Sequence, residues 1–240
     1  MRIEKIGGAT LYLGDCLDIL PELTEKADII ITDPPYSSGG LMRSDRSANS
    51  GAKYTSKKWL PFSGDNRDQR SFTLWCSAWH SQLLKNAAHG ALLFCFIDWR
   101  NLPCMADAVQ VGGWVWRGVI PWNKVVNLRP QRGYFRSQCE YILWATAGPA
   151  IGDGYGWGFF SVPAPTARQR VHPTEKPVDL LTHLLNVHKG QTILDPFMGS
   201  GSTGIAALWE GRRFIGIETD EYWFDVACRR IEEAAREMKT

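Results

Sequence analysis

A short proline-containing motif, Asp33-Pro34-Pro35-Tyr36, follows three consecutive isoleucines near the start of the chain. Such an unbroken β-branched run predicts a buried parallel strand, and functional groups lie at the carboxyl ends of strands of this kind. The prolines lack N–H donors, so the Asp33 carboxylate and the Pro34 carbonyl are available as hydrogen-bond acceptors. These acceptors could bind both protons of an exocyclic amino group and stabilise the positive charge that forms when its nitrogen attacks a sulfonium methyl group. We therefore predict that the four residues are catalytic, with an ordinary turn as the alternative.

The second candidate site is a glycine-rich turn, Gly199 to Gly204, between a short strand and a helix. Its glycines allow a ligand to approach the backbone, and the helix N-terminus offers free N–H donors. Glu218 ends the next strand, 23 residues after Asp195, where its carboxylate can accept both hydroxyls of a ribose. These features predict an adenosine site rather than a dinucleotide site, because the segment does not fit G-x-G-x-x-G; a purely structural turn is the other alternative. The expected contacts are Asp195, Pro196, Phe197, Gly199, Ser200, Gly201, Ser202, Thr203, Glu218 and Thr219.

With these two motifs, the sequence resembles the amino-group DNA methyltransferases, which methylate N6 of adenine or N4 of cytosine. The resemblance covers most of the chain and includes the segments 11–18 (LYLGDCLD) and 172–177 (HPTEKP). It also includes two strands that precede target recognition in the family, at 121–124 and 140–144. The catalytic motif comes first and the glycine-rich turn last, an order that resembles the permuted β group, in which DPPY mostly accompanies N6-adenine products.

The resemblance implies S-adenosylmethionine as the cofactor, S-adenosylhomocysteine as the product and no metal. It implies a site-specific enzyme of a restriction-modification type that transfers the methyl group in line to N6 of a flipped-out adenine. N4 of cytosine, an acceptor in RNA, a small amine or a protein glutamine, and an inactive DNA-binding relative are the alternatives. The further residues that it places at the cofactor, the first two at its adenine ring and the last three at its methionine end, are Asp15, Cys16, Asp33, His172, Thr174 and Lys176.

The resemblance and the alternation of strand-like and helix-like segments predict one α/β domain over residues 1–240. We expect a Rossmann-like methyltransferase fold with a mostly parallel central sheet, an antiparallel hairpin strand and a short inserted target-recognition region. The expected parts are a catalytic half at 1–145 with a mobile loop at 37–70, a recognition region at 146–171 and a cofactor-binding half at 172–240. The expected strands are 27–32, 91–97, 113–122, 139–145, 192–194 and 214–217, and the expected helices are 72–88, 176–190, 205–209 and 221–238.

Basic residues are concentrated in two stretches, 37–70 and 117–170, which hold 14 of the 27 basic residues but only 5 of the 25 acidic ones. This distribution predicts contacts with the phosphates of double-stranded DNA, whose affinity would fall with added salt. Tyr36 could stack on the flipped base, and Phe159 and Phe160 could wedge into the duplex beside Trp157. A solvated loop with a few core aromatics is the alternative. The candidate DNA contacts are Arg43, Lys53, Lys57, Lys58, Lys124, Arg129, Arg132, Arg136, Trp157, Arg168 and Arg170.

The six cysteines lie far apart, without a C-x-x-C pair or a histidine at metal-ligand spacing. We therefore expect reduced thiols, no metal site and a cytoplasmic protein. No apolar run approaches the ~18 residues of a membrane span, so no membrane association is expected. The recognition region is short for the family, and two copies of it could share one DNA site, so we also expect a homodimer.

Overall fold

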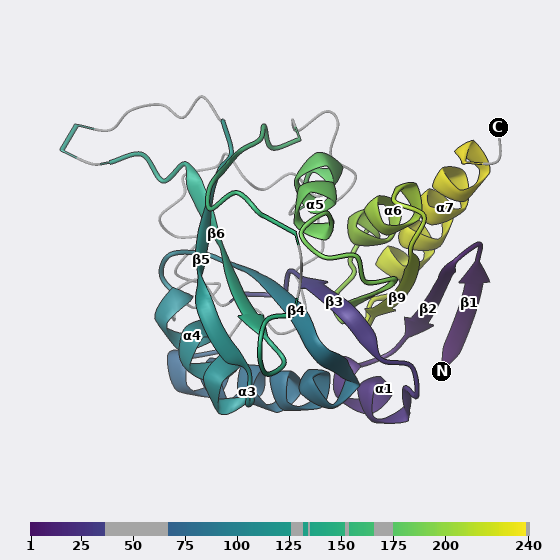
Figure 1. Ribbon diagram of the computed structural model, residues 1–240, viewed down its shortest axis with the longest axis horizontal. Coiled ribbons are helices and arrows are strands. Elements are labelled where there is room, and N and C mark those ends of the chain that lie inside the picture. Colours follow the sequence, from purple (N-terminus) through teal and green to yellow (C-terminus); the bar gives the residue numbers. More distant parts are fainter. Residues whose placement is uncertain (37–66, 126–131, 134, 152–153, 166–174, 239–240) are drawn as a thin grey trace.

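A central nine-stranded sheet organises the computed structural model, which describes residues 1–36, 67–125, 132–133, 135–151, 154–165 and 175–238 (Figure 1). The strand order is β1-β2-β9-β8-β3-β4-β6-β5-β7. The strands are β1 (Arg2–Ile6), β2 (Ala9–Leu13), β3 (Ala27–Thr32), β4 (Ala87–Ile97), β5 (Val115–Asn123), β6 (Cys139–Thr146), β7 (Phe160–Ser161), β8 (Thr192–Asp195) and β9 (Arg213–Glu218).

The middle of the sheet is parallel. β2, β9, β8, β3 and β4 form four consecutive parallel pairs, whereas β6 runs antiparallel to both β4 and β5. β6 therefore begins at the edge of the sheet where β3 and β8 end. This arrangement confirms the predicted mostly parallel sheet with an antiparallel hairpin.

Helices cover both faces of the sheet (Figure 1). α1, α3 and α4 lie on one face, and α5, α6 and α7 lie on the other. The helices are α1 (Cys16–Ile19), the 3₁₀ helix η1 (Leu20–Glu22), α3 (Gln69–Asn86), α4 (Leu102–Val111), α5 (Val178–Leu185), α6 (Ser202–Trp209) and α7 (Glu221–Glu237). No helix in the described ranges is long and apolar enough to cross a membrane.

The core has two parts because successive side chains of a strand point to opposite faces of the sheet. Ile29 and Ile31 of β3 pack in the cluster beneath α5–α7, whereas Ile30 packs beneath α3 and α4. Both faces of β3 are thus buried, which explains why its sequence is continuously apolar. Thr32, at its end, is also fully buried. The site that follows β3 is therefore fixed to the rigid centre of the molecule.

Several elements differ from the sequence predictions. The strands β1 and β2 and the helix α4 were not predicted; β1 is an edge strand whose side chains are mostly exposed, so its sequence lacks a strand-like apolar pattern. α3 begins at Gln69, inside the loop expected at 37–70, because the Asp68 carboxylate caps its first turn. The rest of that loop, 37–66, lies outside the described residues. α5 ends at Leu185 rather than near Gly190, whose N–H donates to His188 Nδ1 in the following turn.

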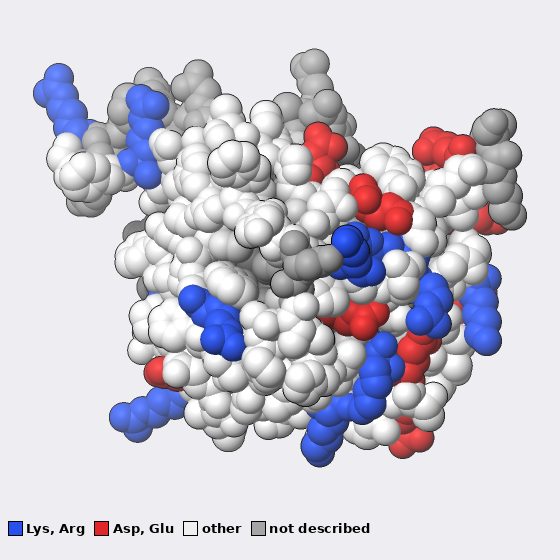
Figure 2. Space-filling view, in the orientation of Figure 1, with Lys and Arg blue, Asp and Glu red and all other residues white. Residues whose placement is uncertain are grey.

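Charge is unevenly distributed over the face seen in Figure 2. Most of the acidic side chains on this face lie over the half that contains α6 and α7. Basic side chains lie among these acidic ones, and others extend from the opposite half, at the end of the segment that continues β5 and β6, where few acidic side chains are seen. On this face, the half bearing the antiparallel strands therefore presents fewer negative charges to a polyanion.

Candidate active site

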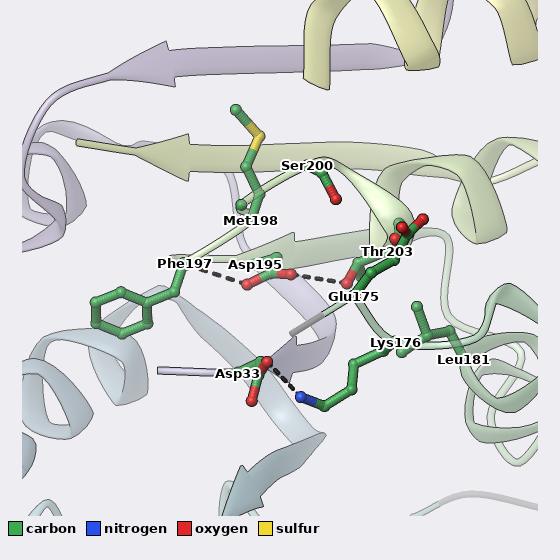
Figure 3. Close-up of a pocket in the computed structure, with 11 residues that line it drawn as sticks. Asp33, Glu175, Lys176, Leu181, Asp195, Phe197, Met198, Ser200 and Thr203 are labelled. Carbon is green, nitrogen blue, oxygen red and sulfur yellow. Dashed lines mark hydrogen bonds and ion pairs between the residues drawn. The ribbon is translucent and has the colours of Figure 1, made fainter. Parts of the chain in front are cut away.

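Three acidic side chains lie at one edge of the sheet, where neighbouring parallel strands end. Asp33 follows β3, Asp195 ends β8 and Glu218 ends β9. The order of these strands places Asp195 between the other two carboxylates. A hollow opens here, and Asp33 and Asp195 both line it (Figure 3). The two predicted motifs therefore meet in one site.

Asp33 is held by two side chains. Its Oδ1 accepts a 2.6 Å hydrogen bond from the Tyr36 hydroxyl, and its Oδ2 accepts one from Lys176 Nζ. Lys176 Nζ also lies 3.3 Å from the Tyr36 hydroxyl and 5.0 Å from the centre of the Phe96 ring. The sequence predicted Lys176 at the cofactor; the structure places its ammonium group directly on the catalytic motif, within the same hollow.

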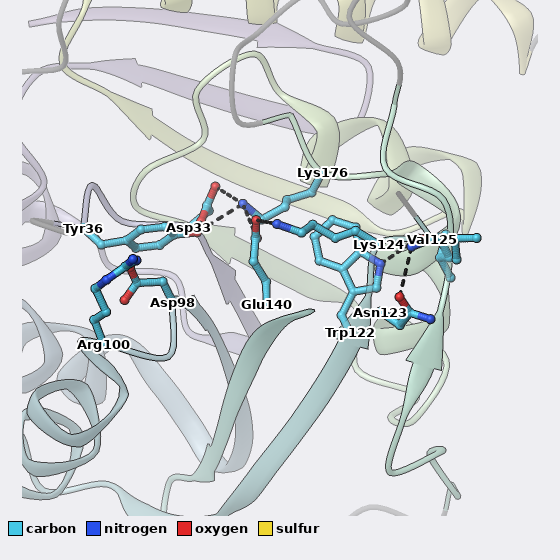
Figure 4. Close-up of polar contacts among 11 residues, drawn as sticks. Asp33, Tyr36, Asp98, Arg100, Trp122, Asn123, Lys124, Val125, Glu140 and Lys176 are labelled. Carbon is cyan, nitrogen blue, oxygen red and sulfur yellow. Dashed lines mark hydrogen bonds and ion pairs between the residues drawn. The ribbon is translucent and has the colours of Figure 1, made fainter. Parts of the chain in front are cut away.

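Glu140, near the start of β6, extends this group of charges (Figure 4). Its Oε2 lies 3.5 Å from Lys176 Nζ, and its Oε1 accepts a 3.1 Å hydrogen bond from Lys124 Nζ. Neither Glu140 nor this role of Lys124 was predicted from the sequence. The available signal was a glutamate at the start of a strand that otherwise carries apolar residues.

Burial and mutual charge set the ionisation of these groups. Burial raises the pKa of Asp33, and Glu140 adds to this rise, whereas Lys176 opposes it. Burial acts to lower the pKa of Lys176, but Asp33 and Glu140 together raise it above the usual value. The pKa of Tyr36 is raised by burial and by Asp33. Lys176 is therefore a permanent cation, and Tyr36 is a hydrogen-bond donor to Asp33.

The glycine-rich turn is built around Asp195, which is 3% exposed. Its carboxylate accepts hydrogen bonds from the Phe197 N–H (3.1 Å) and the Thr203 hydroxyl (2.7 Å), and burial raises its pKa to about 7. Gly199 and Gly201 have φ values of 51° and 83°, in the left-handed region that favours glycine. The buried Asp195 carboxylate therefore holds the turn in place through these hydrogen bonds, and the backbone of the turn faces the hollow.

The two other predicted cofactor segments reach the same edge. The Glu218 carboxylate accepts the N–H groups of Gly199 and Asp220, both at 2.9 Å, and burial raises its pKa. The Gly14 N–H donates to the Glu218 carbonyl at the end of β9, and Asp15 is the next residue in the chain. The Asp15 carboxylate caps α1 through the Leu17 N–H. The Cys16 thiol is buried, so a contact with a ligand would have to come from its backbone.

Arg230 of α7 is a further residue of the site that was not predicted. One of its nitrogens, NH1, donates to the Ser200 carbonyl and hydroxyl at 2.8 and 2.9 Å, and NH2 pairs with Glu175. Arg230 thereby connects the glycine-rich turn to the residue before Lys176. Its position in the last helix, 30 residues from Ser200, gave no sequence signal.

The structure brings together most of the predicted catalytic and cofactor residues. Glu175 and Leu181 also line the hollow beside the glycine-rich turn. Ser200, Ser202 and Thr203 line it and are buried. The predicted residues His172 and Thr174 lie outside the described residues. The other predicted catalytic and cofactor residues lie within the described ranges, at the end of a strand or in the two motifs and their flanks. Besides Lys176, they are Asp15, Cys16, Asp33, Pro34, Pro35, Tyr36, Asp195, Pro196, Phe197, Gly199, Ser200, Gly201, Ser202, Thr203, Glu218 and Thr219.

The predicted DNA contacts fall into different surroundings. Arg132 and Arg136 are exposed, and Trp157 is 79% exposed. The Lys124 ammonium instead pairs with Glu140, toward the catalytic motif. Phe160 was expected to wedge into DNA; this was wrong, because it is 6% exposed and belongs to β7, which pairs with β5. The predicted contacts outside the described residues are Arg43, Lys53, Lys57, Lys58, Arg129, Arg168 and Arg170.

Known proteins share both the sequence pattern and the fold. Residues 27–157 and 147–229 match the family model of the N6/N4 DNA methylases. The Escherichia coli (strain K12) protein YubD is 30% identical over 234 residues, which cover 94% of this chain and 91% of YubD. Two solved structures have the same fold. The M1.HpyAVI–SAM complex is 24% identical with a TM-score of 0.69, over 93% of this chain and 98% of that chain. The cytosine-N4-specific PvuII DNA methyltransferase is 12% identical with a TM-score of 0.72, over 99% and 96%. The chain therefore belongs to the amino-group DNA methyltransferases, the N6/N4 family.

Proposed function

We propose that this DNA methyltransferase transfers the methyl group of S-adenosylmethionine to N6 of adenine in double-stranded DNA. The observation that carries the proposal is the shared hollow, in which Asp33 of the catalytic motif faces Asp195 and the glycine-rich turn. A site of this kind brings an acceptor for amino protons next to a place for an adenosine-containing ligand. That juxtaposition is what direct methyl transfer requires.

The residues of the turn fit S-adenosylmethionine. Gly199, whose φ is left-handed, leaves backbone without a Cβ beside the hollow. The carboxylates of Asp195 and Glu218 can accept hydrogen bonds from hydroxyl or amino groups. Each of these carboxylate oxygens has a second lone pair beyond the hydrogen bond that it already accepts from a backbone N–H or, for one oxygen of Asp195, from the Thr203 hydroxyl. We assign Glu218 to the ribose and Asp15 to the adenine end. When bound, the cofactor supplies a methyl group attached to a positively charged sulfur.

The catalytic motif would activate the attacking nitrogen. The Asp33 carboxylate and the Pro34 carbonyl accept the two protons of the target amino group and turn its lone pair toward the methyl group. The nitrogen forms a bond to the methyl carbon, the electron pair of the S–C bond moves to sulfur, and the nitrogen becomes positively charged. Asp33 then accepts one proton from it and passes this proton to solvent. Tyr36 holds Asp33 through its hydroxyl, and the face of its ring is our candidate for stacking on the base.

Adenine is favoured over cytosine by the DPPY motif and by the order of the motifs along the chain. The second candidate acceptor is N4 of cytosine, because the chain shares its fold with the cytosine-N4-specific PvuII enzyme. Mass spectrometry of nucleosides distinguishes the two bases. Unmethylated duplex DNA is incubated with the enzyme and isotope-labelled S-adenosylmethionine, digested and analysed. Labelled N6-methyl-2′-deoxyadenosine supports the proposal, labelled N4-methyl-2′-deoxycytidine supports the second candidate, and label in neither rejects both. RNA of the same sequence serves as the competing substrate.

We further propose that the protein acts in the cytoplasm as a homodimer and that it contributes to a restriction-modification system. The uneven charge and the short recognition region support a pair of copies that share one DNA site. The free thiols at all six cysteines suit a reducing compartment. Light scattering with and without duplex DNA checks the oligomeric state, and a monomeric mass in both conditions rejects the dimer.

A further inference from the structure

Glu140 lies between two lysines at the edge of the catalytic site (Figure 4). Its side chain is 22% exposed, and that of Lys176 is 7% exposed. Glu140 comes from β6, Lys124 from the residue after β5, and Lys176 from the segment before α5. Three separate elements therefore place their charged groups beside Asp33. Their charges alternate along the row Asp33, Lys176, Glu140, Lys124.

The two oxygens of Glu140 have different surroundings. Oε1 is bound to Lys124 at 3.1 Å, whereas Oε2 has no hydrogen-bond partner among the described residues and faces Lys176 at 3.5 Å. A buried carboxylate oxygen without a hydrogen bond is costly. A buried ion pair as a whole contributes little stability, because replacing both partners by packed apolar side chains is often neutral or stabilising, although removing one partner alone is destabilising. Stability alone therefore does not account for a glutamate here. Its position points to the ammonium group that it shares with Asp33.

Because Glu140 shares Lys176 with Asp33, it affects the ability of the Asp33 carboxylate to accept a proton. An ammonium group with a single carboxylate partner would bind that partner fully and reduce its ability to accept another proton. Glu140 provides a second partner at 3.5 Å, on the side of Lys176 away from the motif. Lys124 in turn balances the charge of Glu140, so that the row as a whole is neutral.

We propose that Glu140 is a positioning residue for methyl transfer: it shares the Lys176 ammonium group, so that Asp33 is not bound by Lys176 alone and remains able to accept the protons of the target amino group. The proposal rests on the proposed function, because it assigns Asp33 as the proton acceptor. Glu140 acts through Lys176 and does not itself touch the base.

The ionisable groups that act on Asp33 come from every neighbouring element. Besides Glu140 and Lys176, they are Tyr36 of its own motif, Cys95 of β4 and Asp195 of β8. Glu140 contributes a charge that raises the pKa of Asp33. Substitution by glutamine removes this charge and leaves Lys176 entirely to Asp33. Both effects lower the pKa of Asp33 and make it a weaker proton acceptor.

The test compares Glu140→Gln with wild type in two measurements. The first is the pH dependence of single-turnover methyl transfer to unmethylated duplex DNA at saturating S-adenosylmethionine. We expect the rate to fall by about 10- to 100-fold, as for a misplaced catalytic group, and its acidic limb to move to lower pH. The second is an NMR titration of ¹³C-labelled aspartate carboxyls, with the Asp33 signal assigned through Asp33→Asn. We expect the Asp33 signal of Glu140→Gln to titrate at lower pH than in wild type.

Glu232→Gln is the matched control, because it removes a carboxylate charge from an exposed ion pair of α7, away from the site. It should leave both measurements unchanged. Equal Asp33 titrations in wild type and Glu140→Gln would overturn the proposal, even if activity fell. Weaker DNA binding with an unchanged rate and acidic limb would also overturn it and would place Glu140 at the base. Absence of methyl transfer by the wild type would reject the proposed function instead, and the NMR titration would still decide whether Glu140 acts on Asp33.

Discussion

Replacing Lys176 by methionine should convert Asp33 from an ionised acceptor into a partly protonated one. Methionine is similar in length and can keep the contact with Phe96, so the main change is the loss of the ammonium group. Burial raises the pKa of Asp33, and Lys176 is the largest influence that lowers it. In Lys176→Met this pKa therefore rises further, and Glu140 is left as a second carboxylate beside Asp33.

The magnitude follows from the burial of the pair. Removing one partner of a buried ion pair costs roughly 3–5 kcal/mol. The Asp33 and Glu140 side chains are 19% and 22% exposed, so solvent reduces this loss and we expect about 2–3 kcal/mol at pH ~8. An acid whose pKa is higher in the folded than in the unfolded protein, as for Asp33 in Lys176→Met, stabilises the fold when the pH is below its unfolded pKa. This stabilisation is lost as the pH rises through its folded pKa. The loss of stability should therefore be smaller near pH ~5 than near pH ~8.

The assay is single-turnover methyl transfer over a range of pH, together with urea unfolding at the two ends of that range. Lys176→Met should be about 100-fold slower near neutral pH and should partly recover as the pH rises, because its acidic limb moves to higher pH. Lys5→Met, at an exposed position of β1, is the control for loss of one positive charge. A Lys176→Met enzyme with the wild-type rate and the wild-type acidic limb would show that Lys176 does not set the ionisation of Asp33.

Two further substitutions test the glycine-rich turn. Arg230→Met removes the three hydrogen bonds that fix this turn from α7. We expect calorimetry to show about 10-fold weaker binding of S-adenosylmethionine, with little change in the transfer rate. The control is Arg229→Met, at the exposed neighbouring position, which should bind the cofactor as the wild type does. Gly201→Ala places a Cβ 3.1 Å from the Cβ of Ala227 at a φ of 83°, so urea unfolding should show a loss of about 2 kcal/mol. Gly211→Ala has a similar φ of 69° but open space around its Cβ, and equal losses in the two variants would show that the contact with Ala227 has no effect.

The catalytic motif and the cofactor turn could be predicted from the sequence because both are local. A continuous isoleucine run specifies β3, and the motif follows it directly, so the position of Asp33 in the chain also gives its position at the sheet edge. The glycines after Asp195 similarly mark the turn from β8 into α6. The parallel packing of these two strands then brings the motifs together.

The charged surroundings of Asp33 could not be predicted, because they depend on contacts between distant segments. Glu140 and Lys176 are 107 and 143 residues away from it in the chain, and no local pattern specifies their distances. Phe160 was misassigned for a related reason: its segment is rich in glycine and proline, and only pairing with β5 makes it a core residue. The predicted helix after Lys176 was too long because Leu185 and Gly190 are joined by a turn that the apolar pattern does not reveal.

The most direct test of Asp33 as the acceptor is methyl transfer by Asp33→Asn, measured with its binding of S-adenosylmethionine. Asparagine keeps the shape of the side chain but presents one N–H₂ group in place of an ionised oxygen. We predict labelled N6-methyladenine in DNA treated with the wild type, a rate at least about 1,000-fold lower for Asp33→Asn, and cofactor binding by both proteins in calorimetry. Methyl transfer by Asp33→Asn at the wild-type rate would contradict the assignment of Asp33 as the catalytic acceptor.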